Sequence, residues 1–229
     1  MAQAVPPKGK ASRRAEAAIA PPKAEVKKIL GILAKTYPDA RIELNFTTPL
    51  ELLVATILSA QCSDARVNLV TPHLFKKYRS AGAYAEADPT VFEEEIRSTG
   101  FFRSKTKSII ACCQKLVRDF GGKVPRTMEE LTSLPGVGRK TANIILYNAY
   151  DVPGFGVDTH VARVTNRLGL VGTEDPDRIE EQMCRVLPQE DWGQATHLFI
   201  FHGRRTCAAK QPRCPQCSLR PLCPWPGKQ

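Results

Sequence analysis

Four cysteines close to the C-terminus constrain the fold of this chain more than any other feature of its sequence. They follow the spacing Cys207-x6-Cys214-x2-Cys217-x5-Cys223. Thiolates this close together can surround a metal centre without ligands from the rest of the chain. We do not expect them to form disulfides, because residues 1–28 lack the apolar core of an export signal. The sequence therefore predicts a metal-centred loop at this end of the fold.

The cysteine spacing also distinguishes between two kinds of metal centre. A structural zinc site usually has two close cysteine pairs separated by a longer loop, whereas only Cys214 and Cys217 form a close pair here. A [4Fe–4S] cluster has four corners, each bound by one thiolate, and it accepts uneven spacing. The spacing favours a [4Fe–4S] cluster and leaves zinc as the alternative.

The local signals along the chain predict helices throughout and an all-α fold. Thr48-Pro49-Leu50-Glu51 combines a capping box with a proline at the first helical position, and Thr127 begins a second capping box. No segment alternates between apolar and polar residues with the period of a strand. The expected helices begin at Pro49, Ser63, Pro89, Ser104 and Thr127 and then span about 139–150, 158–168, 176–187 and 191–202. Four further cysteines lie in these helical patterns and are expected to be small buried side chains: Cys62, Cys112, Cys113 and Cys184.

A glycine-rich loop, Leu134-Pro135-Gly136-Val137-Gly138-Arg139-Lys140, separates a capped helix from a long amphipathic one. Gly136 and Gly138 allow a tight turn and close approach of another backbone. The amide groups at the start of the following helix then point outward with a partial positive charge, which suits a phosphate group. A plain turn between two helices, with glycines for geometry, is the alternative.

Net charge is unevenly distributed over the chain. The total is +10, of which residues 1–28 carry +5, residues 203–229 carry +6, and the 174 residues between them carry −1. Two basic ends on a near-neutral body indicate a polyanionic partner, most simply nucleic acid. We expect residues 1–24 to be a disordered basic tail, and no stretch is long and apolar enough for a membrane span.

Three segments and the cysteine loop resemble the endonuclease III family of helix-hairpin-helix DNA glycosylases. The segments are ELNFTTPLELLVATILSAQ (43–61), LPGVGRKTAN (134–143) and VDTHVARVTNRLG (157–169). The resemblance implies two helical lobes with the active site between them. One lobe would be a six-helix barrel over residues 43–153, and the other would combine residues 25–42 and 154–229 and carry the [4Fe–4S] cluster.

The resemblance also implies roles for individual residues. The lysine that matches Lys140 is the nucleophile in the family, and the aspartate that matches Asp158 assists it, although helix capping alone could explain Asp158. Gln61 would fill the gap left by an extruded base. Phe101 and Phe102 stand where relatives carry an aliphatic wedge that enters the base stack. The hairpin residues would contact the DNA backbone: Leu134, Pro135, Gly136, Val137, Gly138 and Arg139.

Together these features predict a monomeric, bacterial-type cytoplasmic repair enzyme that acts on damaged double-stranded DNA. It would remove oxidised pyrimidines through a lysine Schiff base and then cleave the strand 3′ to the abasic site by β-elimination. Two alternatives remain: a glycosylase with weak or no lyase activity, and a helix-hairpin-helix protein that binds DNA without catalysis.

Overall fold

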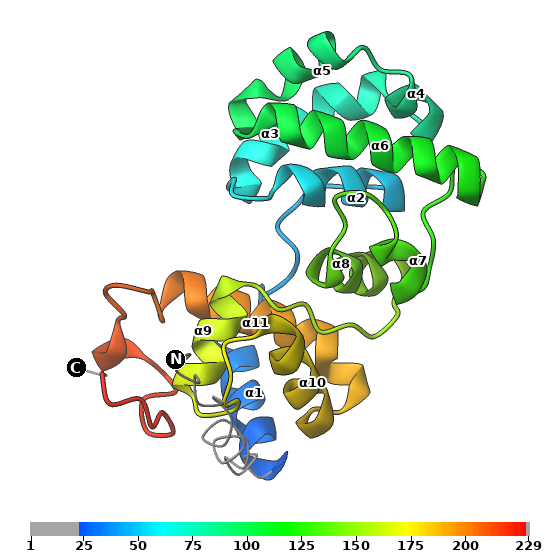
Figure 1. Cartoon of the computed structure of the whole chain (residues 1–229). Helices are drawn as coiled ribbons and strands as arrows, with labels where there is room; N and C mark the ends of the chain where they lie inside the picture. Colours follow the sequence, from blue (N-terminus) through cyan, green and yellow to red (C-terminus); the bar gives the residue numbers. More distant parts are fainter. Residues whose placement is uncertain (1–22, 228–229) are drawn as a thin grey trace, which may run out of the picture. The chain divides into compact units, whose positions relative to one another are not determined.

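The structure is a computed structural model that describes residues 23–227, and these residues form two compact units. Unit 1 contains the described parts of Met1–Pro38 and Phe199–Gln229 together with Val157–Pro188. Unit 2 contains Asp39–Gly156 and Gln189–Leu198. The described residues contain helices and turns but no strand, which confirms the all-α prediction (Figure 1). Between residues 23 and 227, no helix has the length and apolar character needed to cross a membrane.

Unit 2 is built around a helix that is buried on every side. This helix is α2 (Pro49–Leu58), whose residues 52–58 are all buried and which packs against three other helices. A helix that is apolar all round belongs inside a protein. The predicted capping box is present, because the Thr48 side chain accepts from Glu51 N and the Glu51 side chain accepts from Thr48 N. The other complete α-helices of unit 2 are α3 (Asp64–Lys77), α4 (Ala81–Ala85), α5 (Pro89–Ile96), α6 (Phe102–Phe120), α7 (Met128–Thr132) and α8 (Arg139–Tyr150).

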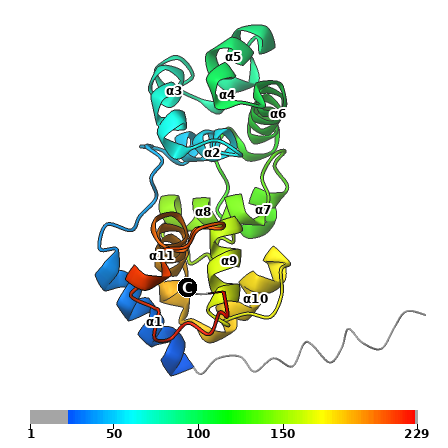
Figure 2. The same ribbon diagram turned by 90° about the vertical axis from the view of Figure 1, so that its left-hand side faces the viewer.

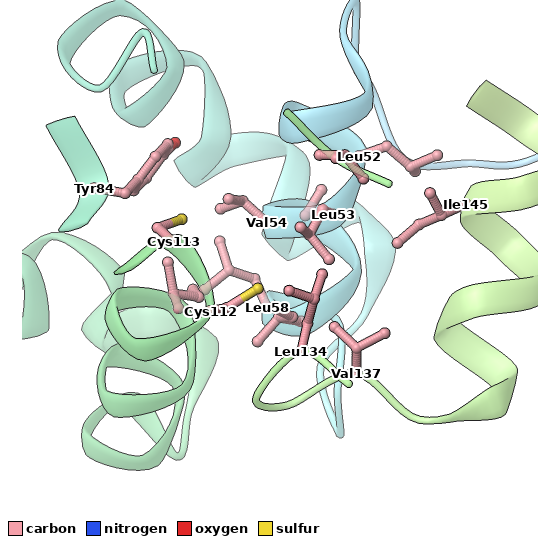
Figure 3. Close-up of a cluster of buried hydrophobic side chains, with 14 of the residues drawn as sticks. Leu52, Leu53, Val54, Leu58, Tyr84, Cys112, Cys113, Leu134, Val137 and Ile145 are labelled. Carbon is pink, nitrogen blue, oxygen red and sulfur yellow. The ribbon is translucent and has the colours of Figure 1, made fainter. Parts of the chain in front are cut away.

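The core of unit 2 joins α2 to helices from most of its length. Figure 3 shows side chains of α2, α6 and α8 pointing toward one another, with Leu134 and Val137 of the glycine-rich loop beside them. Cys112 and Cys113 of α6 are buried as predicted, and burial raises the pKa of the Cys112 thiol to about 12. Cys62 and Cys184 differ from the expectation, because both are only half-buried.

Two details of unit 2 differ from the sequence-based expectation. Residues 43–153 contain seven α-helices, and the one not foreseen is α4, which has five residues and is capped by Ser80. Helix α6 begins at Phe102 and not at Ser104. The earlier start follows from the turn before it, where Gly100 and Phe101 both have positive φ values of 70° and 49°. No side chain caps this helix end.

Unit 1 contains α1 (Lys23–Thr36), α9 (Thr159–Arg167), α10 (Pro176–Val186) and the second half of α11 (Trp192–Arg205). These helices lie side by side in Figures 1 and 2, and the cysteine-rich segment follows α11. Of the predicted tail, residues 1–22 lie outside the described residues, while Lys23 and Ala24 already belong to α1. The buried residues of α1, α9 and α10 are Val26, Ile29, Leu30, Leu33, Val161, Val164, Thr165, Ile179, Met183 and Val186.

The compact units differ from the expected domain bounds mainly at residues 189–198, which belong to unit 2. Three contacts explain this assignment. Gln194 Nε2 donates to Ala40 O at 3.2 Å, Gly156 N donates to Thr196 Oγ1 at 3.0 Å, and His197 Nε2 lies 3.0 Å from Asn148 Oδ1. Compact units are not the same as domains, so the domain bounds expected from the sequence (43–153, and 25–42 with 154–229) stay a prediction.

Candidate functional site

A hollow on unit 2 brings together residues from three distant parts of the chain. Gln61 follows α2, Phe101 precedes α6, and Gly136 lies in the glycine-rich loop. We call this site the hairpin hollow. It therefore brings together three of the residues that the sequence singled out as DNA-binding candidates. Its lining residues are Thr56, Ile57, Ala60, Gln61, Phe101, Ser104, Lys105, Ser108, Gly136 and Thr141.

Backbone strain is concentrated at the hairpin hollow. Three non-glycine residues in the described part of the chain have positive φ, and two of them, Gln61 at 54° and Phe101 at 49°, line the hollow. The third is Asp151, the C-cap of α8. A left-handed conformation costs a non-glycine residue about 1–2 kcal/mol, and such strain recurs at functional sites. The strain at Gln61 and Phe101 therefore marks this hollow as a candidate site.

In the structure, Phe101 and Phe102 have different surroundings, which the sequence could not distinguish. Phe101 lines the hollow and is 64% exposed, which is unusual for a large aromatic side chain. Phe102 is half-buried and packs against the core of unit 2, with Arg97 and Arg103 over its ring. Only Phe101 is placed to insert into another molecule.

The glycine-rich loop is anchored by its apolar residues and bent by one glycine. Leu134 and Val137 are buried, and Val137 N donates to Leu134 O at 3.1 Å. Gly136 has a φ of 78°, and a Cβ there would lie 2.9 Å from Ser108 Cβ. Gly138 has a φ of −95° and open space around its Cβ position. Both geometry and space therefore require glycine at Gly136, but neither requires it at Gly138.

The first turn of α8 follows this loop and borders the hollow. Gly138 is its N-cap, and no side chain caps the helix. The first turn of α8 forms the positive end of the helix dipole. Arg139 is exposed, Lys140 is half-buried, and Thr141 lines the hollow. This arrangement suits an anionic ligand beside Lys140.

Asp158 lies in unit 1 as the N-cap of α9. Its Oδ1 accepts from His160 N and Val161 N, both at 2.8 Å, so the cap fixes the position of the carboxylate. His160 is held by Arg163, whose Nη2 lies 3.0 Å from His160 Nδ1, and burial lowers the pKa of this histidine. Because Lys140 belongs to unit 2, the pairing of Lys140 with Asp158 stays a prediction.

All four C-terminal cysteines line a single cavity in unit 1, which we call the cysteine cavity. Arg167 of α9 forms one wall. Its Nη1 donates to Cys207 Sγ at 3.3 Å, and its guanidinium carbon lies 3.9 Å from the centre of the Trp225 ring. His202 forms part of another wall, and its Nε2 lies 3.7 Å from Cys217 Sγ.

Two kinds of metal centre are candidates for the cysteine cavity. Within residues 23–227, no three His, Cys, Asp or Glu side chains are arranged to hold a single metal ion. Zinc would need its sulfur ligands at about 2.3 Å from one centre. A [4Fe–4S] cluster instead binds each thiolate at a different iron, so the sulfur atoms lie farther apart. The four thiols line one cavity, and the choice between a [4Fe–4S] cluster and zinc stays a prediction.

Comparison with known proteins gives the family. Residues 54–189 match the HhH-GPD superfamily of base excision DNA repair proteins. The chain is 53% identical over 197 residues to endonuclease III of Synechocystis sp., which covers 86% of this chain and 90% of that protein. The chain belongs to the endonuclease III family. Endonuclease III of Escherichia coli K12 is 38% identical over 206 residues, covering 90% of this chain and 98% of that protein.

Solved structures agree with this family assignment. A non-covalent endonuclease III–DNA complex has a TM-score of 0.85 and 44% identity, covering 88% of this chain and 95% of that chain. A trapped covalent intermediate of endonuclease III with DNA matches equally well. A thermostable thymine-DNA glycosylase has a TM-score of 0.79 at 20% identity, a likeness that concerns the fold alone.

Several residues around the two sites of this endonuclease III relative were not singled out from the sequence. Lys105 and Ser108 of α6 line the hairpin hollow, and Arg167 and His202 line the cysteine cavity. Each lies on an ordinary amphipathic helix, so nothing local marks it.

Proposed function

We propose that this chain excises oxidised pyrimidines from duplex DNA and cleaves the strand at the resulting abasic site. Membership of the endonuclease III family makes it a DNA glycosylase and AP lyase of base excision repair. The observation that carries the residue-level proposal is the hairpin hollow, where Gln61, Phe101 and Gly136 meet beside the first turn of α8. The relative solved with DNA supports a duplex as the partner.

The hollow suits an enzyme that extrudes a nucleotide. Removing a base from the stack costs a few kcal/mol, and less for a damaged base. Phe101, exposed and held in a strained turn, would enter the stack, and Gln61 would occupy the vacated space. The amide groups at the start of α8 would hold a phosphate and so fix the position of the enzyme on the strand.

The chemistry requires an unprotonated amine on Lys140. A free lysine has a pKa of about 10.4, so only about one molecule in a thousand carries the neutral amine near neutral pH. The amine nitrogen attacks the sugar carbon that bears the damaged base, and the base leaves with the bonding electrons. The Schiff base formed with the opened sugar acidifies the adjacent carbon, and β-elimination then breaks the strand on the 3′ side.

Asp158 would stabilise the positive charge that develops on the sugar as the base departs. Its proposed partner is Lys140, as the family resemblance implies. All proposed groups belong to one chain, so we expect the enzyme to act as a monomer.

We propose a [4Fe–4S] cluster for the cysteine cavity, bound by Cys207, Cys214, Cys217 and Cys223. When bound, the cluster would cross-link the C-terminal segment and take no part in the excision steps. Arg167 would offset part of its negative charge, because the guanidinium already donates to Cys207 Sγ. Zinc is the alternative occupant.

The test is the reaction of purified protein with a duplex that contains one thymine glycol. We expect strand breaks without alkali, and borohydride should trap a covalent protein–DNA adduct. Lys140→Gln should abolish both base release and trapping while leaving duplex binding within about threefold, because the α8 amides remain. Lys107→Gln, an exposed lysine on α6, is the matched control and should behave as the parent.

Each rival function gives a different result in the same assay. Base release with strand breaks only after alkali would indicate a glycosylase without lyase activity. Binding without base release would indicate a non-enzymatic DNA-binding protein. A Lys140→Gln protein that trapped as well as the parent would move the nucleophile to another amine.

A further inference from the structure

Lys105 is a buried lysine with no role in the chemistry proposed above. It lies in the first turns of α6 and is only 4% exposed. Lysine is almost never fully buried unless it is paired. Within residues 23–227, Lys105 forms no ion pair with a carboxylate, and its ammonium donates to Thr99 O at 2.7 Å. Burial lowers the pKa of this lysine, so the protein gives up stability to keep it there.

The hydrogen bond of Lys105 spans the turn that carries Phe101. Thr99 ends the 3-10 helix Arg97–Thr99 and is itself buried, with its Oγ1 donating to Ile96 O at 2.8 Å. Gly100 and Phe101 follow it, both with positive φ, and α6 then begins. The hydrogen bond from Lys105 therefore links the first turns of α6 to Thr99, the residue at which the turn begins.

The turn needs a stabilising contact because the conformation of Phe101 is energetically unfavourable. Its φ of 49° strains the backbone, and its ring is 64% exposed, so it gains little from packing. No side chain caps the start of α6. Without Lys105, the turn could relax to a conformation in which Phe101 has an ordinary backbone and a less exposed ring.

We infer that Lys105 is a positioning residue that holds Phe101 ready for insertion into the base stack. This inference rests on the proposed function, because it needs Phe101 to act on DNA. Lys105 lines the same hollow as Gln61 and Phe101, so its effect is local to the groups that engage the extruded nucleotide. Its ammonium acts through the backbone of the turn and not on the sugar.

Lys105→Met tests this role, because methionine is similarly long and apolar but has no N–H donor. We expect at least a tenfold lower kcat for base release from thymine glycol, with binding to undamaged duplex unchanged. Strand cleavage at a preformed abasic site should fall by less than threefold, since a site without a base is easier to open. Lys107→Met, exposed and two residues along the same helix, should match the parent on both substrates.

A spectroscopic signal reports the insertion itself. A 2-aminopurine next to the lesion brightens when it is unstacked, and this signal should fall in Lys105→Met to the level of Phe101→Ala. The double variant should be no slower than Phe101→Ala alone, because both changes remove the same wedge. Lys105→Gln, which keeps an N–H donor, should lie between the parent and Lys105→Met.

Three outcomes would overturn the inference. Additive losses in the double variant would mean that Lys105 acts independently of Phe101. A Lys105→Met protein with parental excision and fluorescence, or one impaired equally on both substrates with a lowered melting temperature, would reduce Lys105 to a structural residue. Borohydride trapping in Lys140→Gln that disappears on adding Lys105→Met would make Lys105 a nucleophile instead. If the parent itself released no base, the proposed function would fail first and this role with it.

Discussion

Two aspartates, Asp158 and Asp175, cap helices in unit 1 in the same way. Each uses Oδ1 to accept from the amides two and three residues later, at 2.8 and 2.8 Å for Asp158 and 2.9 and 3.2 Å for Asp175. Asparagine caps helices about as well as aspartate. The substitution to asparagine therefore removes the charge and keeps the cap at either position.

We predict that Asp158→Asn slows base release by about 100-fold or more, as loss of a charge that stabilises a developing cation would. The melting temperature should stay within a few degrees of the parent. Asp175→Asn is the matched control and should change neither property. Single-turnover kinetics on a thymine glycol duplex measure the effect. Equal, small effects of the two substitutions would leave Asp158 as a helix cap and nothing more.

Individual side chains differ in how far the sequence predicts their positions. The capping role of Asp158 was predictable, because the cap depends on neighbours within three residues. The burial of Lys105 was not, because it depends on how α6 packs against the turn before it and against α2. The choice between Phe101 and Phe102 likewise depends on a backbone turn that no local pattern specifies.

The two glycines of the glycine-rich loop have different backbone conformations and surroundings. Gly136→Ala should weaken binding to undamaged duplex by about tenfold and destabilise the protein by about 1–2 kcal/mol, because its φ is 78° and Ser108 Cβ lies in the way. Gly138→Ala should bind within about twofold of the parent, because its φ is −95° and the space around it is open. Fluorescence anisotropy with a labelled duplex measures both. A larger loss from Gly138→Ala than from Gly136→Ala would contradict this account of the loop.

The sequence predicted most helices from their caps, and the two exceptions have different causes. Thr48, Asp88, Asp158 and Asp175 cap the helices that follow them, and all four are residues that favour this position. Helix α6 instead starts after a strained turn with no side-chain cap, so Ser104 was a misleading signal. Helix α4 has five residues, too few to show an apolar period.

The cysteine segment gives a prediction about metal content. Purified protein should be yellow-brown and contain about four irons per chain. Cys214→Ser should lose iron and lower the melting temperature, because the cluster holds the segment together. Cys184→Ser, in α10 of the same unit, should keep its iron, since Cys184 does not line the cysteine cavity. A colourless parent protein with one zinc per chain would rule out the cluster.

For the whole molecule, the division into units depends on contacts that join distant parts of the sequence. Residues 189–198 include the first half of α11, yet they pack with residues 40, 148 and 156 of unit 2. A Cβ at Gly193 would overlap the ring of Tyr147, so this glycine allows the close packing. The sequence shows a helix at this position but not the unit to which each half belongs, because helix periodicity carries no information about the partner.

One of these contacts makes the stability of the molecule sensitive to acid. His197 of α11 is 5% exposed, its Nε2 lies 3.0 Å from Asn148 Oδ1, and burial lowers its pKa to about 4. In the unfolded chain a histidine has a pKa of about 6.5. Between these two values the unfolded chain binds the proton and the folded protein does not, so acid favours unfolding. The stabilisation is therefore complete above about pH 6.5 and is lost as the pH falls toward 4.

We predict that this histidine alone lowers the free energy of unfolding by about 2 kcal/mol between pH 7 and pH 5. His197→Gln keeps an N–H donor for Asn148 but cannot be protonated, so its stability should fall less over this range than that of the parent. His73→Gln is the control, because the His73 side chain is 69% exposed. Urea denaturation of the three proteins at both pH values gives the comparison, and other titrating groups cancel in the difference between variants. If His197→Gln lost as much stability as the parent, then His197 would not be held neutral in the folded protein, and the packing of α11 against α8 in unit 2 would not be the source of acid sensitivity.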